Sequence, residues 1–271
     1  MKQAPRKDPP GKDALGKDVL GHAIADYAAG NRRRKLWVHM QTAAAAASPD
    51  SISAPRPAAN IRVPASSHPR TLPREEMPIK TYFRTAEQMP ELEWIALQHC
   101  RGRILDIGAG AGSHSLALQQ LGQDVTALEI SPLAAAVIKT RGVRKVLCKN
   151  FFALTHTRRY DTLLLLMNGI GIAGNLIRLR AFLRQARALS RPGAALLFDS
   201  CDISYLYPKT PASPPYYGEL IYQYEYRKQR SDPFPWLFID RKTLKKIAAE
   251  EGWQTTILHE DDNDQYLARC H

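Results

Sequence analysis

Cysteine is scarce in this chain of 271 residues. Its four cysteines, at positions 100, 148, 201 and 270, form no Cys-x-x-Cys pair and have no pair of histidines nearby. That spacing argues against a zinc site and against a disulfide framework. We therefore expect no metal and a protein that works in a reducing compartment.

Long hydrophobic runs are also missing. No apolar stretch reaches the roughly 18–20 residues that are needed to cross a bilayer. The first residues, MKQAPRKDPPGKD, lack the apolar segment of a secretion signal. From these two absences we expect a cytoplasmic protein that makes no contact with a membrane.

Acidic residues are outnumbered by basic ones, and the net charge is +12. A surplus of this sign is compatible with a nucleic acid or an acidic partner. The only dense basic run is Arg32-Arg33-Arg34-Lys35, and such runs are most often solvated surface. Charge alone therefore does not identify a partner.

One strand–loop–helix–strand unit stands out between residues 103 and 132. Residues 104–107 are a short, mostly apolar run that predicts a buried parallel strand, with Asp106 near its carboxyl end. A glycine-rich turn follows at 108–112, where missing side chains let the backbone approach a ligand. Ser113 is the expected N-cap of the next helix, and residues 125–130 form a second strand.

This unit predicts a site for a nucleotide-like ligand. A loop and helix N-terminus supply amide donors, and an acid about 20 residues further on holds ribose hydroxyls. Glu129 has that spacing from Gly108. A dinucleotide site needs G-x-G-x-x-G, but Ser113 occupies the third glycine position, and the chain instead reads D-x-G-x-G-x-G from Asp106 to Gly112. An NAD site, or a domain that has lost its ligand, is the alternative.

The stretch resembles the first two motifs of class I S-adenosylmethionine-dependent methyltransferases. The resemblance implies that glycines pack under the cofactor, that Asp106 lies beside its amino acid end, and that Glu129 accepts from its ribose hydroxyls. It also implies that Arg84 binds the cofactor carboxylate, although a surface ion pair is an equal alternative for this arginine. The implied cofactor-binding residues are Arg84, Asp106, Gly108, Ala109, Gly110, Gly112, Glu129, Ile130, Asn150, Phe151 and Met167.

Catalytic residues are not evident from the sequence, and Asn168 and Tyr217 are the weak candidates. Asn168 follows the most apolar strand, where the resemblance places the transferred methyl group, but it fits a cap or a cofactor contact better than catalysis. His114 is expected on a helix surface. Aromatic residues in the segment before the first strand and in a later insertion suggest a substrate pocket, although core packing explains many of them. These substrate candidates are Tyr82, Tyr205, Tyr216, Tyr217 and Trp236.

The predicted fold is α/β, a doubly wound seven-stranded and mostly parallel sheet with an antiparallel last strand. We divide the chain into an N-terminal helical extension (1–41), a linker rich in Pro, Ala and Ser (42–74) and a methyltransferase domain (75–271). Within that domain, residues 201–239 are expected to insert an antiparallel β-pair as a substrate lid. Smaller expectations are a helix over 85–100, and an Arg-Pro-Gly turn before a strand over 194–198.

The function that follows is methyl transfer from S-adenosylmethionine to a small molecule in the cytoplasm. A nucleic acid methyltransferase is the first alternative, supported by the basic charge. Gly169 and Ile170 depart from the pattern of the enzymes that methylate amino groups of nucleic acids, which disfavours a DNA base as acceptor. A non-catalytic module that binds the cofactor or a partner is the second alternative.

Overall fold

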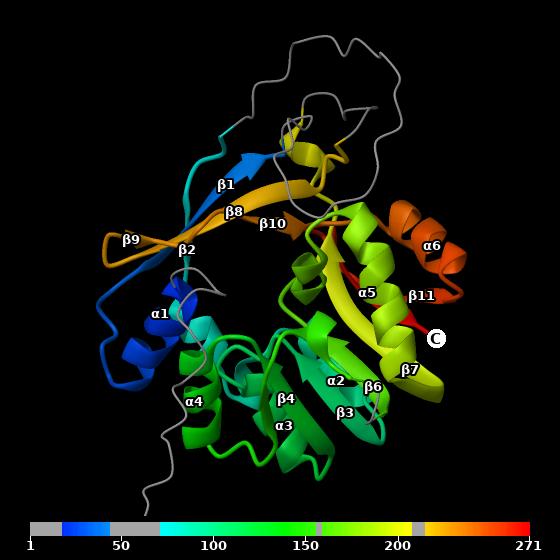
Figure 1. Ribbon diagram of the computed structural model, residues 1–271, viewed down its shortest axis with the longest axis horizontal. Helices are drawn as coiled ribbons and strands as arrows, with labels where there is room; N and C mark the ends of the chain where they lie inside the picture. Colours follow the sequence, from blue (N-terminus) through cyan, green and yellow to red (C-terminus); the bar gives the residue numbers. More distant parts are fainter. Residues whose placement is uncertain (1–17, 44–70, 156–158, 208–214) are drawn as a thin grey trace, which may run out of the picture.

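The computed structural model describes residues 18–43, 71–155, 159–207 and 215–271. Its main element is a seven-stranded sheet with the strand order β11-β12-β7-β6-β3-β4-β5 (Figure 1). Neighbouring strands from β5 to β7 pair in parallel, whereas β12 pairs antiparallel with both β7 and β11. The predicted fold class is therefore confirmed. The strands are β3 (Arg103–Ile107), β4 (Asp124–Glu129), β5 (Val146–Cys148), β6 (Tyr160–Leu165), β7 (Ser190–Cys201), β11 (Thr255–Glu260) and β12 (Gln265–Cys270).

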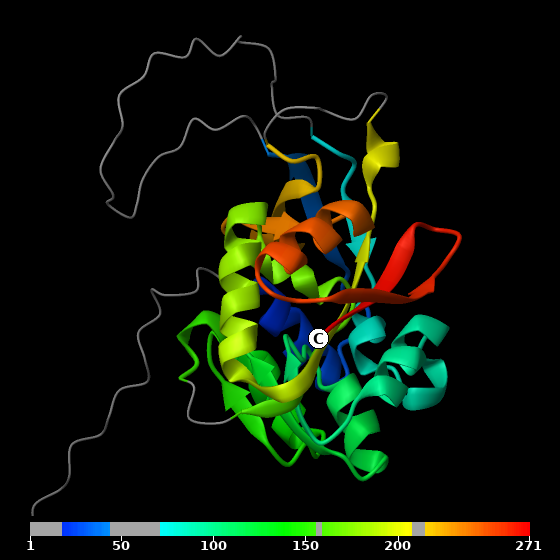
Figure 2. The same cartoon turned by 90° about the vertical axis from the view of Figure 1, so that its right-hand side faces the viewer.

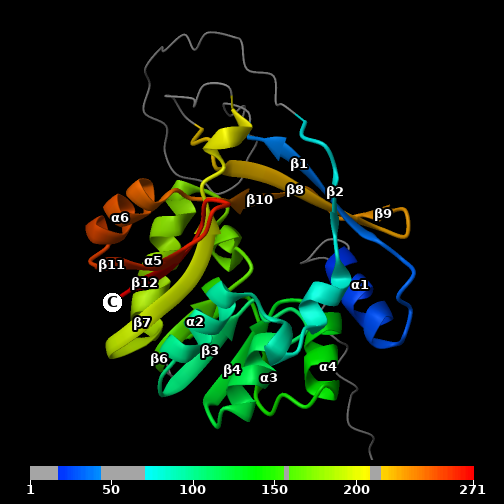
Figure 3. The same cartoon turned by 180° about the vertical axis from the view of Figure 1, so that it is seen from behind.

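Helices cover both faces of this sheet. Figure 3 shows α2 (Glu91–His99) and α3 (Ser113–Gln120) on one face, and Figure 2 shows α5 (Leu176–Leu189) with α6 (Arg241–Glu250) on the other. Successive residues of β6 are buried in the two opposite cores, as the pleat requires: Leu163 packs with α5, and Leu164 packs with α2. None of the described helices is long and apolar enough to span a membrane.

A second, five-stranded antiparallel sheet has the order β10-β8-β1-β2, with β9 paired to β8. It differs from the isolated β-pair expected for the insertion, because β8 pairs along its length with β1 from the N-terminal extension. A two-stranded ribbon is only marginally stable in water, and the added strands supply the missing partners. Its strands are β1 (Leu36–Thr42), β2 (Glu75–Met77), β8 (Glu219–Tyr226), β9 (Gln229–Arg230) and β10 (Phe234–Leu237).

The helix α1 (Val19–Ala28) packs between this five-stranded sheet and α4 (Pro132–Thr140) (Figure 1). The sequence of the N-terminal extension predicts a helix of about four turns that ends near Gly30, but residues 1–17 lie outside the described part of the chain. The described helix begins after Asp18, whose Oδ1 accepts a hydrogen bond from the backbone N–H of Gly21 at 2.9 Å. Most of the expected linker, 44–70, also lies outside the described residues, but Leu72 is buried against the β1 core.

Three local expectations need correction. The helix expected over 85–100 begins only at Glu91, because Pro90 occupies its N-cap and short 3-10 turns precede it. The Arg-Pro-Gly segment is not a turn outside the strand, since β7 already begins at Ser190. Ser113 is the first residue of α3 rather than its cap, and Gly112 holds the cap position with a φ of 82°.

Candidate functional site

A cavity of about 850 Å³ lies between the two sheets. Its floor is formed by residues that follow four parallel strands: Gly108 after β3, Ile130 after β4, Lys149 after β5 and Leu166 after β6. The opposite wall is formed by residues of β8 and β10 and by the segment that precedes α2. Carboxyl ends of parallel strands are where open α/β sheets bind ligands. The five-stranded sheet lies across this end of the molecule (Figure 3).

Glu129 joins the end of β4 to the glycine-rich turn. Its side chain is buried, and its two oxygens accept hydrogen bonds from the backbone N–H groups of Gly110 (2.8 Å) and Ser131 (3.0 Å). Burial raises the pKa of Glu129, and the nearby Asp18 carboxylate adds to this, while the backbone hydrogen bonds act in the opposite direction. A carboxylate offers about four acceptor positions, so Glu129 keeps capacity for a ligand.

The glycine at position 110 is required by its surroundings. Its φ is 59°, and a Cβ added there would lie 2.8 Å from Cδ1 of Tyr82. Gly108 and Ala109 donate hydrogen bonds to the carbonyl of Leu128, which ties the turn to β4. The ring of Tyr82 therefore packs directly on Gly110, whereas nothing lies within 4 Å of a Cβ added at Gly108, which presents bare backbone to the cavity.

Asp106 and a buried charged cluster lie next to this turn. Asp106 accepts a hydrogen bond from Ser115 Oγ at 2.6 Å, and burial raises its pKa. His114 is buried rather than on the helix surface as expected, because its Nε2 lies 2.8 Å from an oxygen of Glu93 on α2. The other Glu93 oxygen forms an ion pair with Arg84, whose Nε is buried without a partner among the described residues.

Two asparagines at the cavity edge have their amides engaged. Asn150 Oδ1 accepts from the N–H of Phe152 at 2.9 Å. Asn168 has a φ of 53°, accepts from Ser200 Oγ at 3.0 Å and donates to the carbonyl of Leu237 at 3.3 Å. Its N–H donates to both oxygens of Asp199, the pKa of which burial raises to about 6. These contacts fix the position of the Asn168 side chain at the end of β6.

The cavity brings together nearly all of the predicted cofactor residues. Gly112 is the exception, because the space above it is filled by Ile138 and Val143, so its lack of a side chain serves packing against the chain around α4. The predicted cofactor residues that line the cavity are Arg84, Asp106, Gly108, Ala109, Gly110, Glu129, Ile130, Asn150, Phe151 and Met167.

The predicted substrate residues divide into two groups. Tyr82 and Trp236 line the cavity, whereas Tyr205, Tyr216 and Tyr217 do not. Tyr205 is 66% exposed. The hydroxyls of Tyr216 and Tyr217 donate to Asp240 (2.6 Å) and Asp202 (2.7 Å), so both tyrosines hold the base of the insertion together.

Two further aromatic residues belong to the cavity wall: Tyr222, one of the aromatic residues by which the insertion suggests a pocket, and Tyr224, which was not singled out from the sequence. Tyr222 and Tyr224 of β8 line the wall, and Tyr222 stacks on Trp236 with ring centroids 5.6 Å apart. The alternation of LIYQYEYR places these tyrosines on one strand face, which is the signal that identifies them. Asp18 also lines the cavity and accepts from Ser131 Oγ at 2.6 Å, but no sequence motif marks it.

This sheet order, with the acid-ended β4 beside the glycine-rich turn and the antiparallel β12 between β7 and the edge strand β11, defines a class I methyltransferase fold. The family described as "Methyltransferase domain" matches residues 105–198. A crystal structure of an S-adenosylmethionine-dependent methyltransferase from Bacteroides fragilis, in complex with S-adenosyl-L-homocysteine, is 37% identical over 94% of both chains, with a TM-score of 0.77. The chain therefore belongs to the S-adenosylmethionine-dependent methyltransferases, and S-adenosylmethionine is its cofactor.

More distant structures share the fold. The CcbJ methyltransferase from Streptomyces caelestis is 14% identical, with 68% of this chain and 93% of that chain covered and a TM-score of 0.56. The sugar N-methyltransferase KedS8 from Streptoalloteichus sp. is 15% identical, with 78% and 98% covered and a TM-score of 0.51. No curated protein matches the chain.

Proposed function

We propose that this methyltransferase acts on a small-molecule acceptor that binds under the aromatic face of the five-stranded sheet. The observation that carries the proposal is the cavity itself. Its volume of about 850 Å³ falls in the range of roughly 300–1,000 Å³ that is typical of small-molecule sites. Strands β8 and β10 cover the floor with aromatic side chains, which favours a compact acceptor over a nucleic acid strand.

The residues present fit the cofactor. The open space over Gly108 and the spare acceptor capacity of Glu129 suit a ligand with ribose hydroxyls. We assign Glu129 to the ribose, Asp106 and Arg84 to the amino acid end, and Asn150 with Phe151 to the adenine edge. Arg84 pairs with Glu93 through Nη2, and its buried Nε has no hydrogen-bond partner among the described residues. This unused donor supports the assignment of Arg84 to a carboxylate.

The acceptor is assigned to the opposite wall. Tyrosine hydroxyls are protonated at neutral pH, and burial raises the pKa values of Tyr222 and Tyr224 further, so both can donate hydrogen bonds to an acceptor. The Tyr82 hydroxyl already donates to Sδ of Met77 at 3.0 Å, so Tyr82 is assigned to the wall by its ring. The bound cofactor supplies a methyl group that is already activated on a sulfonium. The enzyme therefore has to orient the attacking atom and exclude water, and a general base is needed only where that atom must lose a proton.

Methyl transfer is tested by incubating the full chain with methyl-labelled S-adenosylmethionine. The acceptors are a panel of small amines, alcohols, thiols and phenols, together with RNA and duplex DNA. We expect label on at least one small molecule. Label on nucleic acid alone would contradict the proposal, and cofactor binding without any transfer would favour a non-catalytic module.

Replacing Trp236 by alanine should weaken binding of the methyl acceptor. The Trp236 ring lies directly over Gly171, where an added Cβ would overlap it, and it stacks on Tyr222. Loss of this packed aromatic wall should raise the KM for the acceptor about tenfold or more, with the affinity for S-adenosylhomocysteine unchanged. Steady-state kinetics and calorimetry measure the two effects.

The matched control is Trp37→Ala, since Trp37 lies on the same sheet but does not line the cavity and is covered by Lys35 and Arg74. This variant should keep a normal KM for the acceptor. Equal effects of the two substitutions would remove Trp236 from the acceptor site.

A further inference from the structure

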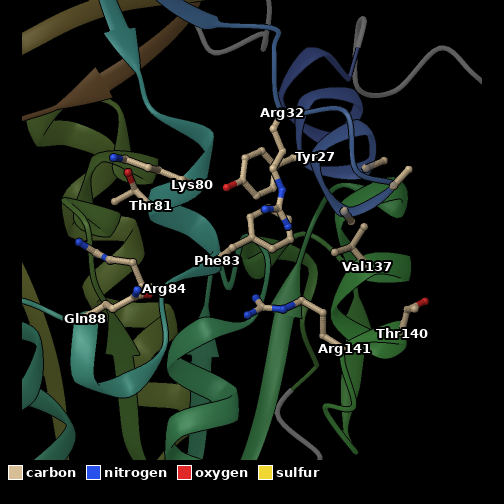
Figure 4. A pocket seen from close by; sticks show the side chains of 13 residues that line it. Tyr27, Arg32, Lys80, Thr81, Phe83, Arg84, Gln88, Val137, Thr140 and Arg141 are labelled. Atoms are coloured by element: carbon tan, nitrogen blue, oxygen red, sulfur yellow. The ribbon is translucent and has the colours of Figure 1, made fainter.

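A second cavity, of about 1,030 Å³, lies outside the cofactor site (Figure 4). It is open to solvent and is bordered by the C-terminal half of α1, the 3-10 segment Ile79–Phe83 and the end of α4. The segment Thr81–Arg84 is the wall between the two cavities. Tyr82 lines the cofactor cavity alone, and Phe83 lines the second cavity alone. The second cavity is therefore a distinct space that adjoins the cofactor site.

Its charged lining is entirely basic. Arg32, Lys80, Arg84 and Arg141 contribute to the wall, and no described acidic residue does. Arg84 is neutralised by Glu93. The other three form no ion pair with any carboxylate in the described part of the chain. The cavity thus concentrates positive charge without a protein counterion.

Arg141 is held in place by neutral groups. Its Nη1 donates to the carbonyl of Ala111 at 2.5 Å and to Oγ of Ser113 at 3.2 Å. The side chain is partly buried, and this burial lowers its pKa, although an arginine keeps its charge at neutral pH. Partial desolvation of an unpaired guanidinium is unfavourable, and an anion in the cavity would remove that cost.

Aromatic contacts hold two of the cations over one ring pair. The rings of Tyr27 and Phe83 lie 4.7 Å apart. The Arg32 guanidinium is 5.5 Å from the Tyr27 centroid, and that of Arg141 is 4.9 Å from the Phe83 centroid. Figure 4 shows the two side chains extending toward this pair, one from the segment after α1 and one from the end of α4. Such stacking limits their motion and prepares them to bind.

From this cavity we infer a second binding site for a phosphate or pyrophosphate group, either free or carried by a small molecule. Guanidinium groups match phosphate oxygens with paired hydrogen bonds. The two guanidinium groups over one ring pair favour a multiply charged anion over a single carboxylate, whereas the Lys80 side chain extends away from that pair (Figure 4). The inference is independent of the proposed acceptor, because none of Arg32, Lys80 and Arg141 lines the cofactor cavity.

The test is a calorimetric titration of the full chain with inorganic pyrophosphate at low salt, in the presence of saturating S-adenosylhomocysteine. We expect binding, and we expect Arg32→Gln to weaken it about tenfold. The matched control is Arg33→Gln, which removes the same charge from the next residue but leaves the cavity lining intact. Arg32 is exposed, so its variant should fold normally.

Arg141→Gln and its control Arg144→Gln form a second pair, because Arg144 is exposed and lies outside the lining. Inorganic phosphate and ADP are then titrated to identify the source of the group. Tighter binding of ADP than of pyrophosphate indicates that a nucleotide carries the group, and equal binding of the two indicates the free anion. Absence of binding to the wild type, or equal effects of Arg32→Gln and Arg33→Gln, would overturn the inference. Markedly tighter pyrophosphate binding in a repeat titration without S-adenosylhomocysteine would also overturn it, because the two ligands would then compete for one site. Binding of RNA without binding of pyrophosphate would also overturn it.

Discussion

Replacing Glu129 by alanine should weaken the binding of S-adenosylhomocysteine about tenfold or more, because a charge-assisted hydrogen bond contributes roughly 1.5–3 kcal/mol. The substitution removes the acceptor assigned to the ribose. It also leaves the N–H groups of Gly110 and Ser131 without their partner, so the glycine-rich turn loses one of its ties to β4 and keeps those to the carbonyl of Leu128. Calorimetric titration of wild type and variant measures the change.

Asp124→Ala is the control for this experiment. Asp124 lies at the other end of β4 and forms exposed contacts with Lys145 and Arg103, which contribute little to stability. That variant should bind S-adenosylhomocysteine like the wild type. An unchanged affinity of the Glu129 variant would remove this residue from the cofactor site.

Replacing Glu93 by alanine should lower the free energy of unfolding by about 3–5 kcal/mol, the usual result of breaking a buried ion pair. Glu93 is buried between Arg84 and His114, and its loss leaves both without their carboxylate. Urea unfolding measures the difference. Glu91→Ala on the same helix is the control. Glu91 is exposed, so its removal should change the free energy of unfolding little.

The same cluster predicts how stability depends on pH. Burial alone would lower the pKa of His114, but the hydrogen bond and charge of Glu93 raise it overall. Burial alone would raise the pKa of Glu93, but His114 and Arg84 lower it overall. The His114 contribution is therefore present below pH about 6.5 and lost as the pH rises through its folded pKa. The Glu93 contribution is lost as the pH falls through its own folded pKa, and Glu93→Ala should flatten both dependences.

The seven-stranded sheet was predictable because its signals are local. The apolar runs of β3 and β6 are buried on both faces, and such runs are typical of parallel strands. The spacing between Gly108 and Glu129 predicted an acid beside the glycine-rich turn. The hydrogen bond from the N–H of Gly110 to Glu129 shows that the two are in contact.

The five-stranded sheet was not predictable in the same way. Its pairing of Leu36 with Tyr226 joins residues that are far apart in the chain, and the sequence of neither segment predicts which strand it will pair with. His114 was misplaced for a related reason, since its burial depends on Glu93 from another helix. Tyr217 looked like a pocket residue from composition, but its hydroxyl donates to Asp202, a contact that only the folded insertion creates.

Calorimetric titration of the full chain with S-adenosylhomocysteine, with NAD as the comparison ligand, tests the assignment of the cavity most directly. Micromolar binding of S-adenosylhomocysteine alone, with a Kd of roughly 1–100 μM that rises in Glu129→Ala, is the predicted result. Binding of NAD without binding of S-adenosylhomocysteine would contradict the assignment of the glycine-rich turn and of Glu129.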